Sequence, residues 1–152
     1  MRLTTQSEYG LVCLRTLCRN DSDKPTSVAG LADQEHMSKD YVEQLFLKLK
    51  RAGIVRSVKG ACGGYLMAKE PSKITIKEVI EALEGDVYEV FCSPEVREKI
   101  VCMYFSRCSL RPVWAKLKEL IDDFFSRITL DTLLRDETTV VKNLNEIVVT
   151  EA

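Results

Sequence analysis

The sequence contains a single histidine, His36, among its 152 residues. Histidine is the side chain that enzymes use most often as a general base, and no other pairing of a nucleophile with a base is recognisable. Sites that hold a metal mainly through imidazole are disfavoured for the same reason. We therefore expect a protein that is not an enzyme and has no catalytic residues.

Long apolar segments are also missing. No run approaches the ~18 residues of a membrane-spanning helix, and the opening residues MRLTTQSEYG lack the apolar core of a signal peptide. There is no internal repeat or low-complexity segment. A hydrophobic content of 45% with 30% charged residues is ordinary for one soluble domain. We expect a cytoplasmic protein without a membrane partner.

The sequence has almost no net charge, but its basic residues are unevenly distributed. Against 22 lysines and arginines stand 23 acidic residues, a net charge of -1. The segment from Ser38 to Lys73 holds eight basic and three acidic residues, which gives it +5 and leaves -6 for the rest. Such a basic segment is typical of nucleic-acid binding, although a solvated basic surface gives the same pattern.

A helix-turn-helix pattern overlaps the start of the basic segment. Residues 4–19 repeat apolar side chains at helical spacing, Ser27 can cap a short second helix, and Ser38 can cap a third. Only a few residues separate the second helix from the third, whose apolar face combines Tyr41, Val42, Leu45, Phe46 and Leu49. Two such helices joined by a tight turn are typical of DNA-binding helix-turn-helix units.

A glycine-rich hairpin follows the third helix. Gly53 can end that helix, and residues 54–58 and 65–68 read as two short strands around the turn KGACGG. This turn lacks the Walker spacing and lies between strands, so a nucleotide-binding loop is disfavoured. The pattern predicts the wing of a winged helix-turn-helix domain.

Three further helices are expected after the wing. Thr75 and Glu78 form a capping-box pattern for a helix that ends near Gly85. Residues 112–128 form a longer helix whose wide apolar arc predicts burial against its own domain and a second copy, with packing inside one chain as the alternative. Thr129 can cap a short helix, and the tail after Asp136 permits another helix without requiring one.

The predicted fold is mainly α with a small β-hairpin, a winged helix-turn-helix plus a long C-terminal dimerisation helix. Residues 1–84 form the DNA-binding domain and residues 85–111 a cysteine-containing sensor loop. Residues 112–136 form the dimerisation helix and a short capping helix, and residues 137–152 are the tail.

Three of the six cysteines, Cys92, Cys102 and Cys108, lie in one polar stretch with gaps of nine and five residues. Thiolates are soft ligands, so the stretch suits an iron-sulfur cluster or zinc, with unligated thiols as the alternative. The same stretch contains no obvious fourth ligand for such a metal site. The candidates are His36, which more simply reads as a turn residue, and Glu8, which could instead be a solvated acid stabilised by the helix dipole. Cys13 and Cys18 fall in an apolar helical pattern and are expected to be buried.

Together these residues resemble the Rrf-two type winged-helix transcriptional regulators, which include the IscR-like and NsrR-like iron-sulfur sensors. The resemblance runs from Met1 to about Asp136. It is carried by MRLT with Tyr9, SKDYVEQLFLKLKRAGIV, VKGACGGYLMAK, the three cysteines, PVWAKL and ITLDTLL, in that order.

The resemblance implies a homodimer with crossing C-terminal helices that binds double-stranded DNA at a pseudo-palindromic operator. A two-iron or four-iron cluster in each cysteine loop would set DNA affinity. Tyr41, Glu43 and Gln44 match positions that read base edges, and Lys59 matches a minor-groove contact of the wing. Phosphate contacts fall to Lys48, Lys50 and Arg56. The candidate DNA-binding residues also include Ser38 and Lys39.

The sequence departs from the family pattern near the cluster. Arg111 stands where IscR-like members have a histidine three residues after the last cysteine, and a guanidinium cannot serve as a neutral ligand. Ser7-Glu8-Tyr9-Gly10 instead resembles the NsrR-like opening, whose acidic residue reaches the other subunit's cluster. This implies coordination by Cys92, Cys102, Cys108 and Glu8 of the partner subunit, with a four-iron cluster preferred over a two-iron one. The gap after Cys92 is longer than usual, and Cys62 replaces a common proline.

The functional hypothesis is a homodimeric DNA-binding regulator, a repressor, controlled by an iron-sulfur cluster that senses iron, redox state or nitric oxide. The alternative is a winged-helix regulator without a cluster, controlled by a partner protein or by direct thiol oxidation.

Overall fold

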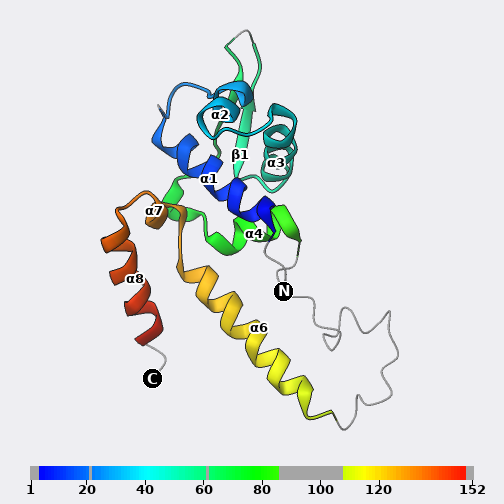
Figure 1. Cartoon of the computed structure of the whole chain (residues 1–152), viewed down its shortest axis with the longest axis vertical. Coiled ribbons are helices and arrows are strands. Elements are labelled where there is room, and N and C mark those ends of the chain that lie inside the picture. The colour runs from blue at the N-terminus through cyan, green and yellow to red at the C-terminus, as the bar shows by residue number, and fades with distance from the viewer. Residues whose placement is uncertain (1–3, 21, 61, 86–107, 150–152) are drawn as a thin grey trace.

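The computed structural model of the protein describes residues 4–20, 22–60, 62–85 and 108–149. Along the chain these form α1 (Thr5–Arg19), α2 (Val28–Gln34), α3 (Lys39–Arg51), β1 (Val55–Val58), β2 (Gly64–Met67), the short 3-10 helix η1 (Pro71–Lys73), α4 (Ile76–Glu84), α6 (Leu110–Arg127), α7 (Leu130–Leu133) and α8 (Glu137–Val149). Figure 1 shows α1 to α4 and the hairpin gathered in one body, from which α6 runs outward. The predicted architecture, mainly α with one β-hairpin in a winged helix-turn-helix, is confirmed.

Side chains next to the helix starts determine where the first helices begin. The Ser27 hydroxyl accepts a hydrogen bond from the Gly30 amide at 3.0 Å, and the Ser38 hydroxyl accepts one from the Tyr41 amide at 3.3 Å. Both halves of the capping box between Thr75 and Glu78 are present at α4. Each cap satisfies amides that the first turn of a helix cannot pair internally, so the three predicted starts are confirmed.

The core lies where the inner faces of α1, α3 and α4 meet. Its fully buried side chains come from these helices, from α2 and from the residue before β1. They include Leu14, Val42, Leu45, Phe46, Leu49 and Val79, with Leu31 in α2 and Ile54 before β1. The Phe46 ring packs on that of Tyr65 in β2 with centroids 4.9 Å apart. This contact joins the third helix to the hairpin, so their relative position is set by the core.

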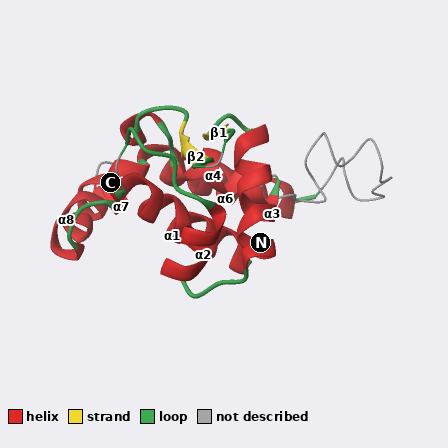
Figure 2. Cartoon of the chain, turned by 90° about the horizontal axis from the view of Figure 1, so that it is seen from above, coloured by secondary structure: helices red, strands yellow, loops and turns green. Residues whose placement is uncertain are grey.

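The hairpin pairs β1 with β2 in antiparallel register, from Val55 opposite Met67 to Val58 opposite Gly64. Both strands lie within one residue of the predicted bounds. The amide and carbonyl of Thr26 pair with those of Tyr65 at 3.0 and 2.9 Å, which ties the loop before α2 to the wing. A side chain at Gly64 would meet the Thr26 carbonyl oxygen at 2.2 Å, so this close approach requires glycine. Figure 2 shows the hairpin beside the helices from above.

The C-terminal helices attach through a short backbone bridge. The Ile76 amide donates to the Ile128 carbonyl at 2.8 Å, and the Leu130 amide donates to the Ile74 carbonyl at 2.9 Å. Thr129 stands at the cap position of α7, but its side chain makes no capping hydrogen bond. The tail forms the helix α8 over residues 137–149, which the sequence pattern had only permitted. Among the described residues, no helix combines the length and apolar content that a membrane crossing needs.

Candidate nucleic-acid interface

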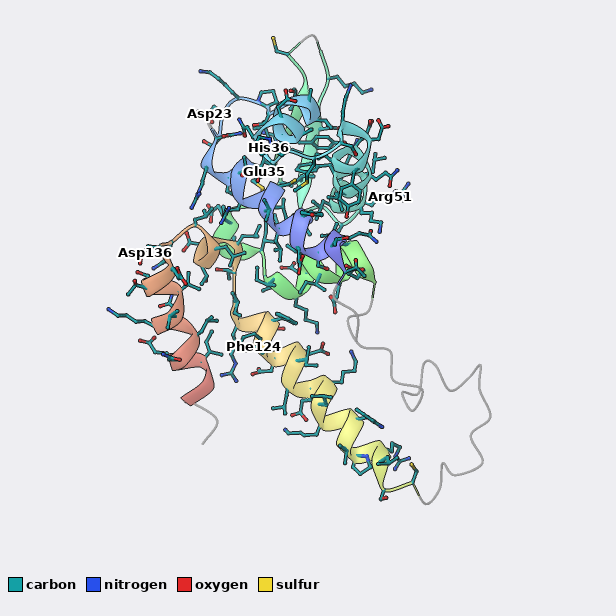
Figure 3. All side chains as sticks on the ribbon, in the orientation of Figure 1. Asp23, Glu35, His36, Arg51, Phe124 and Asp136 are labelled. Atoms are coloured by element: carbon teal, nitrogen blue, oxygen red, sulfur yellow. The ribbon has the colours of Figure 1, made fainter. Side chains whose placement is uncertain are left out.

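The third helix presents a polar face opposite its buried one. Lys39, Glu43, Gln44 and Lys50 are exposed, because they fall between the apolar positions that face the core. Ser38 is exposed at the N-terminus of this helix, and its hydroxyl forms the cap. Figure 3 shows Arg51 at the outer edge of α3, pointing away from the body. A helix with one polar face free has the arrangement needed to enter a major groove.

Tyr41 occupies a different place from its neighbours Glu43 and Gln44. Its ring stacks edge-on against that of Tyr9 in α1, with centroids 5.9 Å apart and planes at 89°. The side chain is half-buried, and its hydroxyl oxygen is buried without a hydrogen-bond partner among the described residues. Tyr41 therefore positions α3 against α1, and the free polar face is formed by Glu43 and Gln44.

Lys48 was expected at a DNA phosphate, but its ammonium group makes contacts inside the protein. The Nζ atom donates to Gln6 Oε1 at 2.5 Å and to the Leu83 carbonyl at 2.7 Å. Lys50 and Arg56, by contrast, are exposed. The phosphate role consequently fits Lys50 and Arg56 better than Lys48. The contacts of Lys48 are with residues far away in the sequence, so the local sequence does not reveal them.

The hairpin adds cations beside the helix. Arg56 is exposed on β1 and Lys59 is exposed in the turn. Burial and the negative charge of Glu43 together raise the pKa of Tyr65 in β2. Glu43 is therefore close enough to the hairpin for its charge to act on Tyr65, and α3 contacts β1.

The proposed cluster ligands are only partly within the described residues. Cys108 is half-buried just before α6, and Glu8 is exposed in the first turn of α1. Cys92 and Cys102 lie outside the described residues. Within the described ranges, no three His, Cys, Asp or Glu side chains come together as a metal site. His36 is exposed in the turn between α2 and α3, with φ +53°.

The remaining cysteines differ in their accessibility. Burial raises the pKa of Cys13 and of Cys18 to about 11, and the nearby Glu35 charge adds to the effect at Cys13. These two thiols stay protonated at neutral pH and are poor metal ligands. Cys62 is exposed in the wing. The donor chemistry of Cys13 and Cys18 therefore disfavours both as metal ligands.

The sequence matches known proteins over nearly its whole length. The sequence model of the Rrf2 family, described as an iron-dependent transcriptional regulator, matches residues 3–136. The chain belongs to the Rrf2 family. This Rrf2 protein is 33% identical to the HTH-type transcriptional regulator IscR of Pectobacterium atrosepticum over 137 residues, covering 90% of this chain and 81% of the relative. The resemblance read from the motifs is confirmed.

Solved structures give the same result. CymR (YrzC), the global cysteine regulator of B. subtilis, superposes with a TM-score of 0.67 at 30% identity and covers 88% of this chain and 96% of its own. IscR of T. potens superposes with a TM-score of 0.66 at 30% identity, covering 88% and 86%. The Rrf2 protein is thus a DNA-binding transcriptional regulator related to IscR. Because its relatives are named as regulators, the expectation that it is not an enzyme is confirmed.

Proposed function

We propose that this Rrf2 protein is a cytoplasmic, homodimeric repressor whose binding to a pseudo-palindromic operator is controlled by an iron-sulfur cluster that senses iron, redox state or nitric oxide. The observation that carries the proposal is the free polar face of α3, which lies beside the cationic hairpin on a rigid core. This surface supports DNA reading. Control by a cluster is supported by the family description and by the three-cysteine pattern.

Specific recognition would come from the middle of α3. The Glu43 carboxylate can accept a hydrogen bond from a cytosine amine, and the Gln44 amide can pair with adenine through two hydrogen bonds. Affinity without sequence choice would come from phosphate contacts of Lys39, Lys50 and Arg56. The free end of the wing carries Lys59, whose charge suits a narrow minor groove.

Dimerisation is supported by an apolar stripe along α6. Leu110 and Val113 are 59% and 58% exposed, and Trp114, Leu117 and Leu120 continue the stripe at helical spacing. The other side of the same helix packs on the core through Ile121, Phe124 and Phe125. A contiguous apolar surface of this kind marks an interface. A second copy would place two α3 helices at the spacing of adjacent major grooves, ~34 Å.

The cluster would be held by Cys92, Cys102, Cys108 and Glu8 of the partner subunit, as a four-iron rather than a two-iron cluster. When bound, it supplies a centre that reacts with oxidants or nitric oxide and is lost when iron is scarce. The described ligands fit this role because Cys108 is only half-buried, just before α6, and Glu8 is exposed on α1.

DNA binding and cluster content can be tested together. Protein purified without oxygen should show visible absorbance with stoichiometric iron and sulfide, and it should bind DNA from its own upstream region with steep salt dependence. Its operator affinity should change when the cluster is removed. Binding that is absent or insensitive to salt in every cluster state would contradict the DNA-reading part of the proposal.

A second candidate function is a regulator without a cluster, controlled by a partner protein or by thiol oxidation. The similarity to CymR, named as a cysteine regulator, and the exposed Cys62 favour it. A colourless, iron-free protein with full operator affinity would support this candidate over the first.

A further inference from the structure

Lys48 joins the third helix to the C-terminal end of α4. Its ammonium group contacts the Leu83 carbonyl at 2.7 Å and Gln6 Oε1 at 2.5 Å, so one side chain of α3 reaches both α4 and α1. The last carbonyls of a helix have no partner within the helix, and they form the negative end of its dipole. A cation at this place is therefore stabilising for α4 and restrains α3.

Glu84, the last residue of α4, makes the complementary contact with the start of α1. Its Oε1 atom accepts from the Ser7 hydroxyl at 2.8 Å, the Thr4 hydroxyl at 2.5 Å, and the Thr4 and Ser7 amides at 3.1 and 3.2 Å. Burial by itself would raise the pKa of Glu84, but these hydrogen bonds outweigh it and the pKa is lowered. An acidic group at a helix N-terminus is the favourable sign for the dipole.

The Leu83 side chain of α4 also packs against the backbone of α1 beside these contacts. A side chain at Gly10 would meet Leu83 Cδ1 at 2.3 Å, so glycine lets the two helices touch. Ser7 is only 3% exposed and is the one polar residue buried among the described residues. The contacts of Lys48, Glu84, Thr4, Gln6, Ser7 and Leu83 are called the helix junction below. It combines two charged side chains of opposite sign with close packing, and it joins α1, α3 and α4.

The helix junction stands at the point where the chain leaves the DNA-binding domain. Glu84 is followed by Gly85, and the described residues stop there before the segment that contains Cys92 and Cys102. Glu8 is the residue next to Ser7. The same few contacts therefore connect α3, the helix that carries Glu8, and the root of the cysteine-bearing segment.

We propose that Lys48 and Glu84 are positioning residues: through the helix junction they hold α3 in its orientation for operator binding and connect that orientation to the state of the cysteine segment. The connection to cluster state rests on the proposed function. The assignment of Lys48 as a positioning residue and not a phosphate contact stands on the geometry alone.

The test compares Lys48→Met with Lys50→Met in the full-length dimer. Both substitutions remove one lysine charge from α3 and keep a long side chain, but Lys50 is exposed and outside the helix junction. Operator affinity is measured at several salt concentrations for oxygen-protected and cluster-free protein. Losing a phosphate contact lowers the slope of log affinity against log salt by about 1 for each copy.

We expect Lys50→Met to lower the salt slope and to leave the affinity ratio between the two cluster states unchanged. Lys48→Met should keep the slope and bring that ratio toward 1, from the roughly 5- to 150-fold range typical of coupled sites. Glu84→Gln, which cannot contact phosphate, should reduce the ratio in the same way. It is also a second variant if Lys48→Met does not fold by circular dichroism.

A lower salt slope in Lys48→Met with an unchanged ratio would overturn the inference, because Lys48 would then be a phosphate contact. An unchanged ratio in Glu84→Gln would overturn the role of Glu84. If wild-type protein shows equal affinity in both states, the proposed cluster control fails, and the connection to cluster state fails with it. The salt slopes of cluster-free protein then still decide the assignment of Lys48.

Discussion

Truncating Leu120 to alanine tests the dimer interface on α6. Leu120 is 42% exposed and is the last residue of the apolar stripe that we assign to the second copy. Leu47 on α3 is a leucine with the same exposed fraction, 42%, on the surface that we assign to DNA. The pair separates the effect of position from that of residue type, since both substitutions remove the same atoms from a helix.

The expected magnitude follows from the area still open to solvent. Full burial of a leucine side chain contributes about 1.5–3 kcal/mol, so burying the exposed 42% at a two-fold interface contributes about 1.3–2.5 kcal/mol per dimer. Since 1.4 kcal/mol corresponds to a tenfold change in a dissociation constant, that of the dimer should rise by about 8- to 60-fold in Leu120→Ala. Leu47→Ala should leave it unchanged.

Sedimentation equilibrium at several protein concentrations measures this constant directly. Circular dichroism on the same samples shows whether each variant keeps its helices. The assignment of α6 as the dimer interface is refuted if Leu120→Ala dimerises as wild type does, or if Leu47→Ala weakens the dimer to the same extent.

Four other substitutions give separate tests. Gly64→Ala places a methyl group 2.2 Å from the Thr26 carbonyl, so thermal unfolding should show a lower midpoint, and an unchanged midpoint would refute the close approach. Because the pKa of Glu84 is lowered from 4.5, its stabilisation is present above the unfolded pKa and is lost as the pH falls through the folded pKa. The stability difference between wild type and Glu84→Gln should accordingly shrink below about pH 5 in acid titrations of denaturant midpoints. Gln44→Ala should weaken operator binding by about 1–3 kcal/mol and relax the preference at one base pair in binding to a panel of operators, whereas Arg56→Met should weaken all sequences alike.

Features that depend on contacts between near neighbours in sequence could be predicted. The Ser38 cap and the Thr75 capping box each span three residues, so the residue types at that spacing are sufficient evidence. A comparable signal at the tail was missed. Asp136 accepts hydrogen bonds from the Thr139 amide and hydroxyl at 3.0 and 2.6 Å, which begins α8 with a local cap.

Features that depend on tertiary contacts could not be predicted. Lys48 and Lys50 are indistinguishable by residue type, and only the fold turns Lys48 toward a carbonyl 35 residues away and a side chain 42 residues away. Glu84 reaches the start of α1 across 77 to 80 residues, with no local pattern to indicate it. The third helix and the hairpin were placed correctly, because their caps, turns and apolar spacing are local patterns. The finer roles of single side chains depend on packing.

In the proposed function, a cluster held by the three cysteines controls operator binding. The most direct measurement is the operator affinity of oxygen-protected wild type beside that of the variant with Cys92, Cys102 and Cys108 all replaced by serine, with iron and sulfide assayed in both. We predict that wild type contains iron and sulfide, that the variant contains neither, and that the two differ in operator affinity. Wild type free of metal and equal in affinity to the variant would contradict the account.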